Sequence, residues 1–291
     1  MVRTKGRLDT EVSAALLFVC YRAPMEIRYV DAHCHIQFDQ YKGDDVELIE
    51  RMREEGVAGI VVGVDVESSK RAVALAEKHE HLFASVGLHP NHESNEWYEI
   101  KKYRELAKSP KVIAIGECGL DYFRPAHFND EAKRKQKAIF NDQIMLAAEL
   151  NKPLIVHARP SKGTMDAYHD LIDILREAKN KHPNLRGDIH FFVGGIQEAE
   201  ALIQLDFTLS FTAVITFARD YDAVIRTVPL ANILSETDAP YVAPASRRGS
   251  RNDPLAVVDV VAKIAEIRGD DSEVVRATLL ANAERLFTLK N

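Results

Sequence analysis

The chain has 291 residues, 46% of them hydrophobic and 28% charged, which is enough apolar material for a large core and excludes an intrinsically disordered protein. A net charge of −6 and a pI near 6.0 argue against a protein that coats DNA with a broad basic surface, although a nuclease needs positive charge only locally. The three cysteines form no C-x-x-C pair and no apolar run is long enough to span a bilayer, so we expect a reduced, cytoplasmic protein with no membrane partner.

The N-terminal residues 1–24 are expected to lie outside the core. They contain one short apolar run, Val12–Cys20, and the basic stretch before it is interrupted by Asp9 and Glu11, which argues against a signal peptide. Met25 then opens a segment that leads directly into the first predicted strand. We therefore predict an extension over residues 1–24, for which a start assigned too far upstream is one explanation, and a single domain over residues 25–291.

From Met25 onward, short β-branched apolar runs alternate with longer amphipathic stretches, a pattern typical of repeated βα units. The predicted strands are Arg28–Asp31, Gly56–Val64, Leu82–His89, Val112–Glu117, Pro153–His157, Asp188–Phe192, Phe207–Phe211 and Ile233–Glu236. The predicted helices are Val46–Glu55, Ser69–His79, Tyr98–Lys108, Asp130–Leu150, Thr164–Asn180, Gly195–Gln204, Asp222–Val228, Pro254–Arg268 and Ser272–Leu286. Such a series predicts an α/β protein with a single (β/α)8 TIM barrel, whose active site lies at the C-terminal face of the strands.

Polar side chains that can bind metals lie at or just after the C-terminal ends of these predicted strands. They are His33, His35, Glu117, His157, His190 and Asp238. Taken singly, each has a structural alternative, because a lone histidine is often a core residue, Glu117 could pair with an arginine, and Asp238 precedes Ala-Pro as a turn-forming residue does. Their gathering on one predicted face of the barrel favours a metal site.

The spacing of these residues suggests how two cations would be shared. Residues i and i+2 of an extended segment point the same way, so His33 and His35 can chelate one cation. Asp238 can complete that site or take a proton from an attacking water, and Glu117 has two oxygens with which to bridge both cations. The histidines of the fifth and sixth strands would hold the second cation. Imidazole and carboxylate ligands suit Zn²⁺, Mn²⁺, Co²⁺ or Fe²⁺.

Basic side chains after two predicted strands are candidates for binding substrate. Arg248 and Arg251 follow the eighth strand and Arg159 follows the fifth, where a guanidinium could hold a phosphate oxygen. An exposed basic loop, or a helix start for Arg251, explains them equally well. His89 is a candidate for a phosphate or leaving-group contact, with a hydrogen-bonded core histidine as the alternative.

Four further residues have less direct interpretations. Tyr122, with its neighbour Asp121, could support Glu117 or pair with Arg251, or form a turn. His81 lies in a helical or loop context and is expected at the surface. Cys34, between two candidate ligands, is expected to point away from them into the core.

Segments in this order resemble the TatD-like metal-dependent DNases of the amidohydrolase superfamily, from about Tyr29 to Phe287. The most specific are Gly-Glu-Cys-Gly-Leu-Asp-Tyr at 116–122, Glu-Thr-Asp-Ala-Pro at 236–240 and Arg-Gly-Ser-Arg-Asn-Asp-Pro at 248–254. The resemblance implies one metal on His33, His35 and Asp238, and a second on His157 and His190, with Glu117 bridging both. It also implies hydrolysis of DNA phosphodiesters, often as a 3′-to-5′ exonuclease, with Mg²⁺ or transition metals.

We therefore expect DNA as the partner, as single strands or 3′ ends, and a monomer is compatible with the sequence. The chain departs from the family pattern at Val193, where a small hydroxyl is usual, and at Pro160, where an acidic residue is usual. Either departure could alter substrate choice.

Two other functions remain open at this point. An amidohydrolase-type esterase, amidase or tRNA deacylase would use the same metals, although many such enzymes bridge them with a modified lysine where Glu117 stands here. A non-catalytic nucleic-acid-binding barrel would have no need of the full ligand set.

Overall fold

The computed structural model describes residues 25–91, 98–123 and 129–289, so the predicted extension over residues 1–24 lies outside the described part of the chain. Within these ranges, eight parallel strands form one sheet in the order β1 to β8. The strands are β1 (Tyr29–Cys34), β2 (Val57–Val62), β3 (Leu82–Val86), β4 (Val112–Asp121), β5 (Leu154–Arg159), β6 (Gly187–His190), β7 (Phe207–Phe211) and β8 (Ile233–Ser235).

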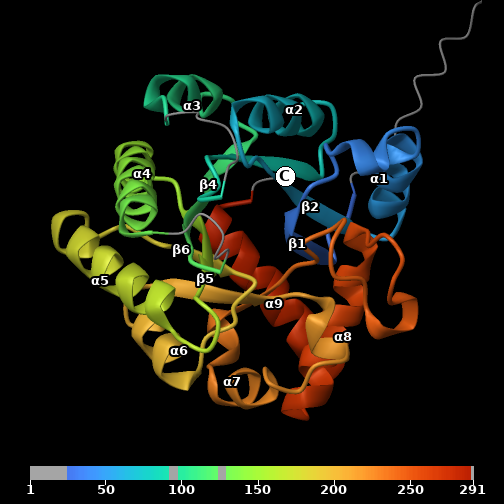
Figure 1. Ribbon diagram of the computed structural model, residues 1–291. Coiled ribbons are helices and arrows are strands. Elements are labelled where there is room, and N and C mark those ends of the chain that lie inside the picture. Colours follow the sequence, from blue (N-terminus) through green and yellow to red (C-terminus); the bar gives the residue numbers. More distant parts are fainter. Residues whose placement is uncertain (1–24, 92–97, 124–128, 290–291) are drawn as a thin grey trace, which may run out of the picture.

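Backbone contacts between β1 and the segment after β8 close the sheet. Cys34 forms a parallel bridge with Ala239, and the amide of Asp238 donates to the carbonyl of His33 over 2.9 Å. Helices follow the strands and surround them (Figure 1). The (β/α)8 barrel predicted from the sequence is therefore confirmed.

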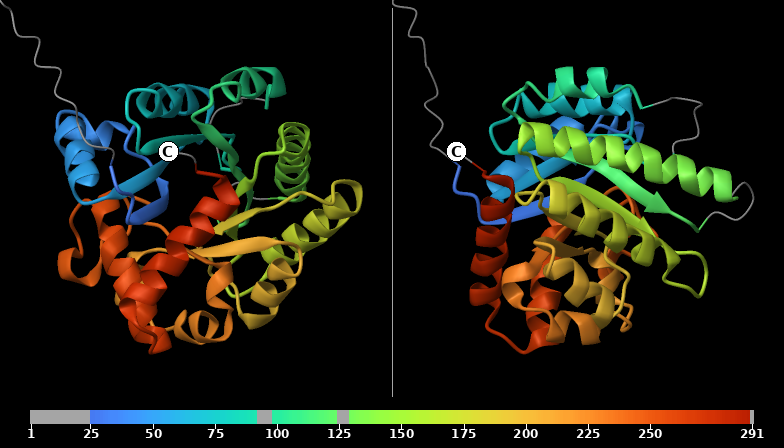
Figure 2. Two further views of the ribbon diagram at one scale, coloured as in Figure 1. Left: turned by 180° about the vertical axis from the view of Figure 1, so that it is seen from behind. Right: turned by 90° about the vertical axis from the view of Figure 1, so that its left-hand side faces the viewer.

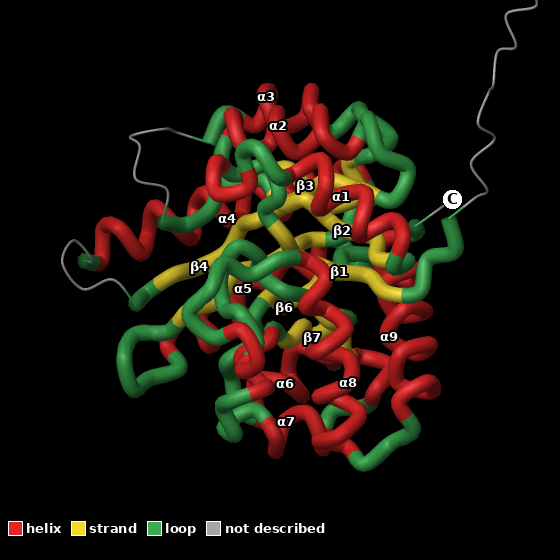
Figure 3. The backbone as a smooth tube through the Cα atoms, turned by 90° about the vertical axis from the view of Figure 1, so that its right-hand side faces the viewer, coloured by secondary structure: helices red, strands yellow, loops and turns green. Residues whose placement is uncertain are grey.

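The helices that enclose the strands can be followed from the side in Figure 3. They are α1 (Asp45–Glu54), α2 (Val66–Ala76), α3 (Ile100–Leu106), α4 (Asp130–Leu150), α5 (Asp166–Lys181), α6 (Ile196–Ile203), α7 (Asp222–Thr227), α8 (Val257–Arg268) and α9 (Ser272–Phe287). Side-chain caps fix several of their starts, as at α4, where Asn129 accepts the amide of Ala132. No helix of the described residues is both long and apolar enough to cross a membrane.

Each strand contributes to two hydrophobic layers, because successive side chains point to opposite faces. In β2, Ala58, Ile60 and Val62 belong to a cluster inside the barrel, whereas Val57 and Val61 belong to the layer beneath the helices. All six residues of β2 are buried. This explains why the strands appear in the sequence as continuous apolar runs.

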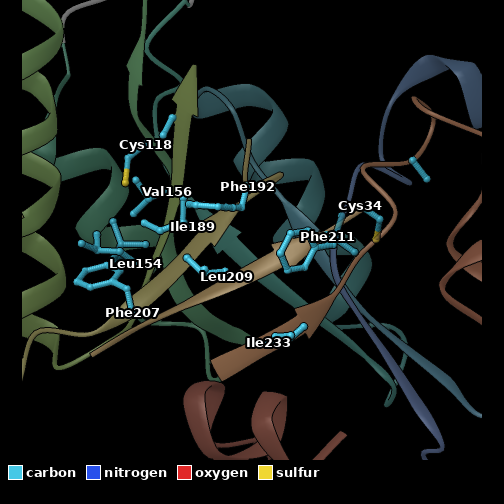
Figure 4. Close-up of a cluster of buried hydrophobic side chains, with 14 of the residues drawn as sticks. Cys34, Cys118, Leu154, Val156, Ile189, Phe192, Phe207, Leu209, Phe211 and Ile233 are labelled. Carbon is cyan, nitrogen blue, oxygen red and sulfur yellow. The ribbon is translucent and has the colours of Figure 1, made fainter. Parts of the chain in front are cut away.

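The outer layer also buries both described cysteines. Figure 4 shows Cys118 near Val156 and Leu154, and Cys34 near Phe211, among the side chains of this layer. The Sγ atoms of Cys34 and Cys118 point to backbone carbonyls, away from the barrel axis. The expectation that Cys34 belongs to the core is confirmed.

Helix α9 covers the end of the barrel opposite the site described below. Its residues Ala283, Leu286 and Phe287 pack against the interior cluster together with Val30 of β1. The left view of Figure 2 shows α9 lying across this end. The other end of the barrel is left open for ligands.

Two strands depart from regular pairing just before residues of the site. The β1–β2 register shifts between Asp31 and Cys34, and the β4–β5 register shifts between Ile115 and Cys118. Such irregularities rotate the following side chains and often occur beside active sites. Pairing with β5 also carries β4 to Asp121, beyond the predicted end at Glu117.

Candidate metal centre

Three side chains meet at the open end of the barrel, beside β1 and β8. Nε2 of His33 lies 3.2 Å from Nε2 of His35, and Oδ1 of Asp238 lies 3.6 Å from the latter and 3.9 Å from the former. Ligands of a tetrahedral cation with bonds of about 2.1 Å lie about 3.4 Å apart. The three atoms therefore have the spacing that ligands of one cation need.

The carboxylate of Glu117 lies between two groups of histidines. Its Oε2 atom is 3.4 Å from Nε2 of His33. Its Oε1 atom is 2.9 Å from Nδ1 of His157, 3.4 Å from Nε2 of His89 and 3.7 Å from Nε2 of His190. One oxygen thus faces each group, which is the arrangement that a carboxylate shared by two cations requires.

Carboxylates behind two of the histidines set which ring nitrogen faces the site. Nδ1 of His190 donates to Oε2 of Glu236 over 2.9 Å, so its Nε2 is left toward Glu117. Nε2 of His157 lies 3.3 Å from Oδ2 of Asp121, so its Nδ1 faces the same carboxylate. Such outer partners fix the tautomer of a metal-binding histidine and raise its basicity.

Burial and neighbouring charges together set the protonation of the cluster. Burial opposes charge on Glu117, but His89 and His33 hold the pKa of this carboxyl well below its usual range. Burial likewise opposes a charged His190, yet Glu236 raises the pKa of His190 to about 10. Despite its burial, Asp238 has a lowered pKa because the imidazoles of His35, His190 and His33 lie close to its carboxylate. The low pKa values of Glu117 and Asp238 favour their ionised forms, and the high pKa of His190 favours a proton that a bound cation would replace.

The donor set fits a divalent metal ion. Among the described residues, the charged partners of Glu117, Asp238 and Glu236 are histidines, with no lysine or arginine in ion-pair contact. Nitrogen and carboxylate ligands together favour Zn²⁺, Mn²⁺, Co²⁺ or Fe²⁺. Buried carboxylates that lack a permanent cation are expensive unless a metal compensates them.

A cavity of about 890 Å³ opens over these side chains. His89 lines it, together with Arg159 at the end of β5. Aromatic side chains form much of the remaining wall, among them Phe38, Phe191 and Tyr241. This volume is typical of a pocket for one small ligand or one end of a chain.

The other candidate substrate residues lie elsewhere. Tyr122 is buried and its hydroxyl donates to Asp170 over 2.9 Å, so burial of its ring contradicts a direct contact with substrate. Arg248 is exposed outside the cavity wall, with its guanidinium 4.3 Å from the ring centre of Phe217.

Arg251 has its own protein partners instead of a place on the cavity wall. Its guanidinium donates to the carboxylate of Asp44 and to the carbonyl of Gln40, and it stacks 4.5 Å from the ring centre of Tyr41. This arrangement does not support a role for Arg251 in binding phosphate. The surface position expected for His81 was also wrong, since this ring is 2% exposed and contacts the carbonyl of Ile49.

Sequence reasoning missed Glu236 and the aromatic wall. Glu236 had a usable signal, because it stands two residues before Asp238 at the end of β8 and so faces the same side of the strand. Phe191 and Tyr241 lie in loops, where no periodic sequence pattern predicts which way a side chain points.

The family model described as TatD related DNase matches residues 30–288. The metal-dependent hydrolase YabD of Bacillus subtilis, described as uncharacterized, is 35% identical over 268 residues, which cover 89% of this chain and 98% of that protein. The 3′-5′ ssDNA/RNA exonuclease TatD of Erwinia tasmaniensis is 34% identical over 271 residues, with 89% and 99% covered. The crystal structure of YjjV, a TatD homologue from Escherichia coli, matches with a TM-score of 0.79 and 30% identity, covering 90% of this chain and 98% of that one.

Proposed function

The chain belongs to the TatD-related DNase family of metal-dependent hydrolases, and from this we propose that it hydrolyses phosphodiester bonds of DNA with two divalent cations, from the 3′ end of single strands. The observation that carries the proposal is the position of Glu117, whose two oxygens face two different groups of histidines. The proposed ligands are His33, His35 and Asp238 for one cation and His157 and His190 for the other, with Glu117 shared.

Two cations would supply an activated water and stabilise the attacking and leaving oxygens of an in-line displacement at phosphorus. The side chain of Asp238 is 15% exposed and lines the cavity, so it can accept a proton from water. Nδ1 of His89 accepts the amide of Asn91 over 3.1 Å, which leaves the proton on Nε2. We propose that this Nε2–H, which lies 3.4 Å from Oε1 of Glu117 beside the cavity, donates to a phosphate or leaving-group oxygen of bound substrate.

The choice of strand and direction rests on two supports. The relative from Erwinia tasmaniensis is named as a 3′-5′ exonuclease on single-stranded DNA and RNA. The cavity of about 890 Å³ suits one strand end better than a duplex. Arg159 lines this cavity, and we propose that it holds a phosphate of the incoming strand.

The test is cleavage of end-labelled single-stranded DNA by the purified protein with Mg²⁺, Mn²⁺, Co²⁺ or Zn²⁺, alongside metal analysis. We expect products that shorten from the 3′ end, and their loss in Glu117→Gln, which removes the shared charge but keeps the shape. Turnover of esters, amides or charged tRNA without DNA cleavage would instead favour the alternative amidohydrolase activity. Binding of DNA with no turnover of any substrate would favour a non-catalytic barrel.

A further inference from the structure

A second cavity, of about 720 Å³, adjoins the catalytic one beyond the ends of β4 and β5. Arg159 and Val193 line both cavities, so the two are neighbours at this wall. Phe123, Met165, His169 and the 160–164 segment form the remaining sides. No residue proposed as a metal ligand lines this second cavity.

Two pairs of side chains lead outward from the metal centre to this cavity. Asp121 of β4 contacts His157 of β5 over 3.3 Å. Two residues further along each chain segment, Phe123 and Arg159 form the next pair, with the guanidinium carbon 4.0 Å from the ring centre. The β4–β5 register pairs Asp121 with Arg159. The outer pair, Phe123 with Arg159, therefore lies directly beyond the inner pair, Asp121 with His157.

The outer pair is accessible. Phe123 is 42% exposed, and Arg159 is exposed as well. In the described ranges, no carboxylate forms an ion pair with Arg159 or with the exposed Lys162. The cavity therefore combines an accessible ring with two positive charges.

The 160–164 wall is held in place from behind. The carboxylate of Asp166 accepts the amide of Ser161 over 2.9 Å and the hydroxyl of Thr164 over 2.9 Å, and it also binds Lys133. The carboxylate of Asp166 is thus occupied by its own loop. Val193, which also lines the cavity, offers it methyl groups and no hydroxyl.

We propose that this second cavity binds the unpaired nucleobase of the nucleotide adjoining the scissile bond, stacked on the Phe123–Arg159 pair, with its phosphate near Lys162. An apolar wall with an aromatic ring suits a base, and the unpaired positive charges suit the strand's phosphates. Stacking on a side chain requires an unpaired base, so the subsite would select single strands. This inference rests on the proposed phosphodiesterase activity and adds the residues that recognise the strand.

The test uses single-stranded oligonucleotides in which one abasic nucleotide is moved through the positions nearest the 3′ end. In the wild type, we expect the abasic nucleotide at one position beside the scissile bond to lower kcat/KM by about 5- to 100-fold, mainly through KM. In Phe123→Ala, kcat/KM for the intact oligonucleotide should fall by a similar factor. An abasic nucleotide at that position should then lower kcat/KM little further. Phe123→Tyr, which keeps a ring, should respond like the wild type.

Met145→Ala is the control, since Met145 is an apolar side chain of α4 that is 50% exposed and lines neither cavity. The subsite is refuted if Phe123→Ala retains both the wild-type KM and the full abasic effect while cleavage itself proceeds. Absence of cleavage by the wild type with every oligonucleotide would be a different result, because it overturns the proposed function and the subsite with it.

Discussion

Nδ1 of His190 donates a hydrogen bond to Oε2 of Glu236 over 2.9 Å, and the other oxygen of the same carboxylate accepts the amide of Phe191. Both partners are buried, with Glu236 fully so. The ring of His190 also stacks on that of His33, with 3.6 Å between ring centres. One carboxylate therefore fixes both the tautomer of His190 and the backbone beside it.

Substitution of Glu236 should weaken metal binding without removing a proposed ligand. In Glu236→Gln only one oxygen remains for two donors, so either His190 or the amide of Phe191 loses its acceptor. We expect metal affinity to fall about 10- to 100-fold, as outer partners of metal-bound histidines typically contribute. Calorimetric titration of metal into chelator-treated protein measures this, with the exposed Glu284→Gln as control. An affinity equal to that of the wild type would show that Glu236 has no positioning role.

Part of this site follows from the sequence by simple alternation. In β5, Ile155 lies in the interior cluster and His157 and Arg159 follow it at steps of two. The same period connects Leu234 of β8 with Glu236. For these strands, the apolar pattern predicts which polar side chains face the axis.

The same rule fails in β1 and β4, whose register shifts have no signature in the apolar pattern. Val30 and Ala32 lie in the interior cluster, so strict alternation would also turn Cys34 inward. The shift after Asp31 instead turns His33 inward, with His35 following. The side-chain positions of loop residues are harder still to predict from sequence. The position of Arg251, for example, depends on a tertiary partner that is distant in sequence.

Gly119, between the two acidic residues of β4 that face the site, should not tolerate a side chain. Its φ is +128°, and an added Cβ would lie 2.1 Å from the carbonyl oxygen of His157. We expect Gly119→Ala to lower the free energy of unfolding by more than about 3 kcal/mol and to displace His157. Gly249→Ala is the matched control, since its φ of +89° is also unfavourable but nothing lies within 4 Å of the added Cβ. We expect Gly249→Ala to lower the free energy of unfolding, measured by urea denaturation, by only about 1 kcal/mol. Equal losses in the two variants would contradict the packing argument.

His81 should make the fold less stable in mild acid. Burial lowers the pKa of His81 to about 4, below the value of about 6.5 for an unfolded chain. Above pH 6.5 neither state binds the proton, so the effect is absent. As the pH falls from 6.5 to 4, the unfolded chain takes up the proton first, and stability declines by at most about 3 kcal/mol.

In His81→Gln, whose amide can still donate to Ile49, this part of the decline should disappear. The measurement is the difference in unfolding free energy between variant and wild type across that pH range, with the exposed His169→Gln as control for loss of an imidazole. A difference that stays constant with pH would show that buried His81 does not titrate as described.

Removal of metal should destabilise the protein, because the carboxylates of Glu117, Asp238 and Glu236 all lie close to His33 in a largely buried cluster. A cation that binds only the folded state at 100 times its Kd adds about 2.7 kcal/mol, which for a domain of this size raises Tm by about 5–10 °C. Since the imidazoles must lose protons to bind it, the gain should shrink as the pH is lowered. Thermal unfolding before and after EDTA, with metal restored as the return step, measures the shift.

His157→Ala combined with His190→Ala should show a smaller rise in Tm with metal, because one group of proposed ligands is lost while the group of His33 and His35 remains. If EDTA leaves the Tm of the wild type unchanged and the purified protein carries no metal, the cluster is held by hydrogen bonds between its imidazoles and carboxylates, and the proposed cation sites are wrong.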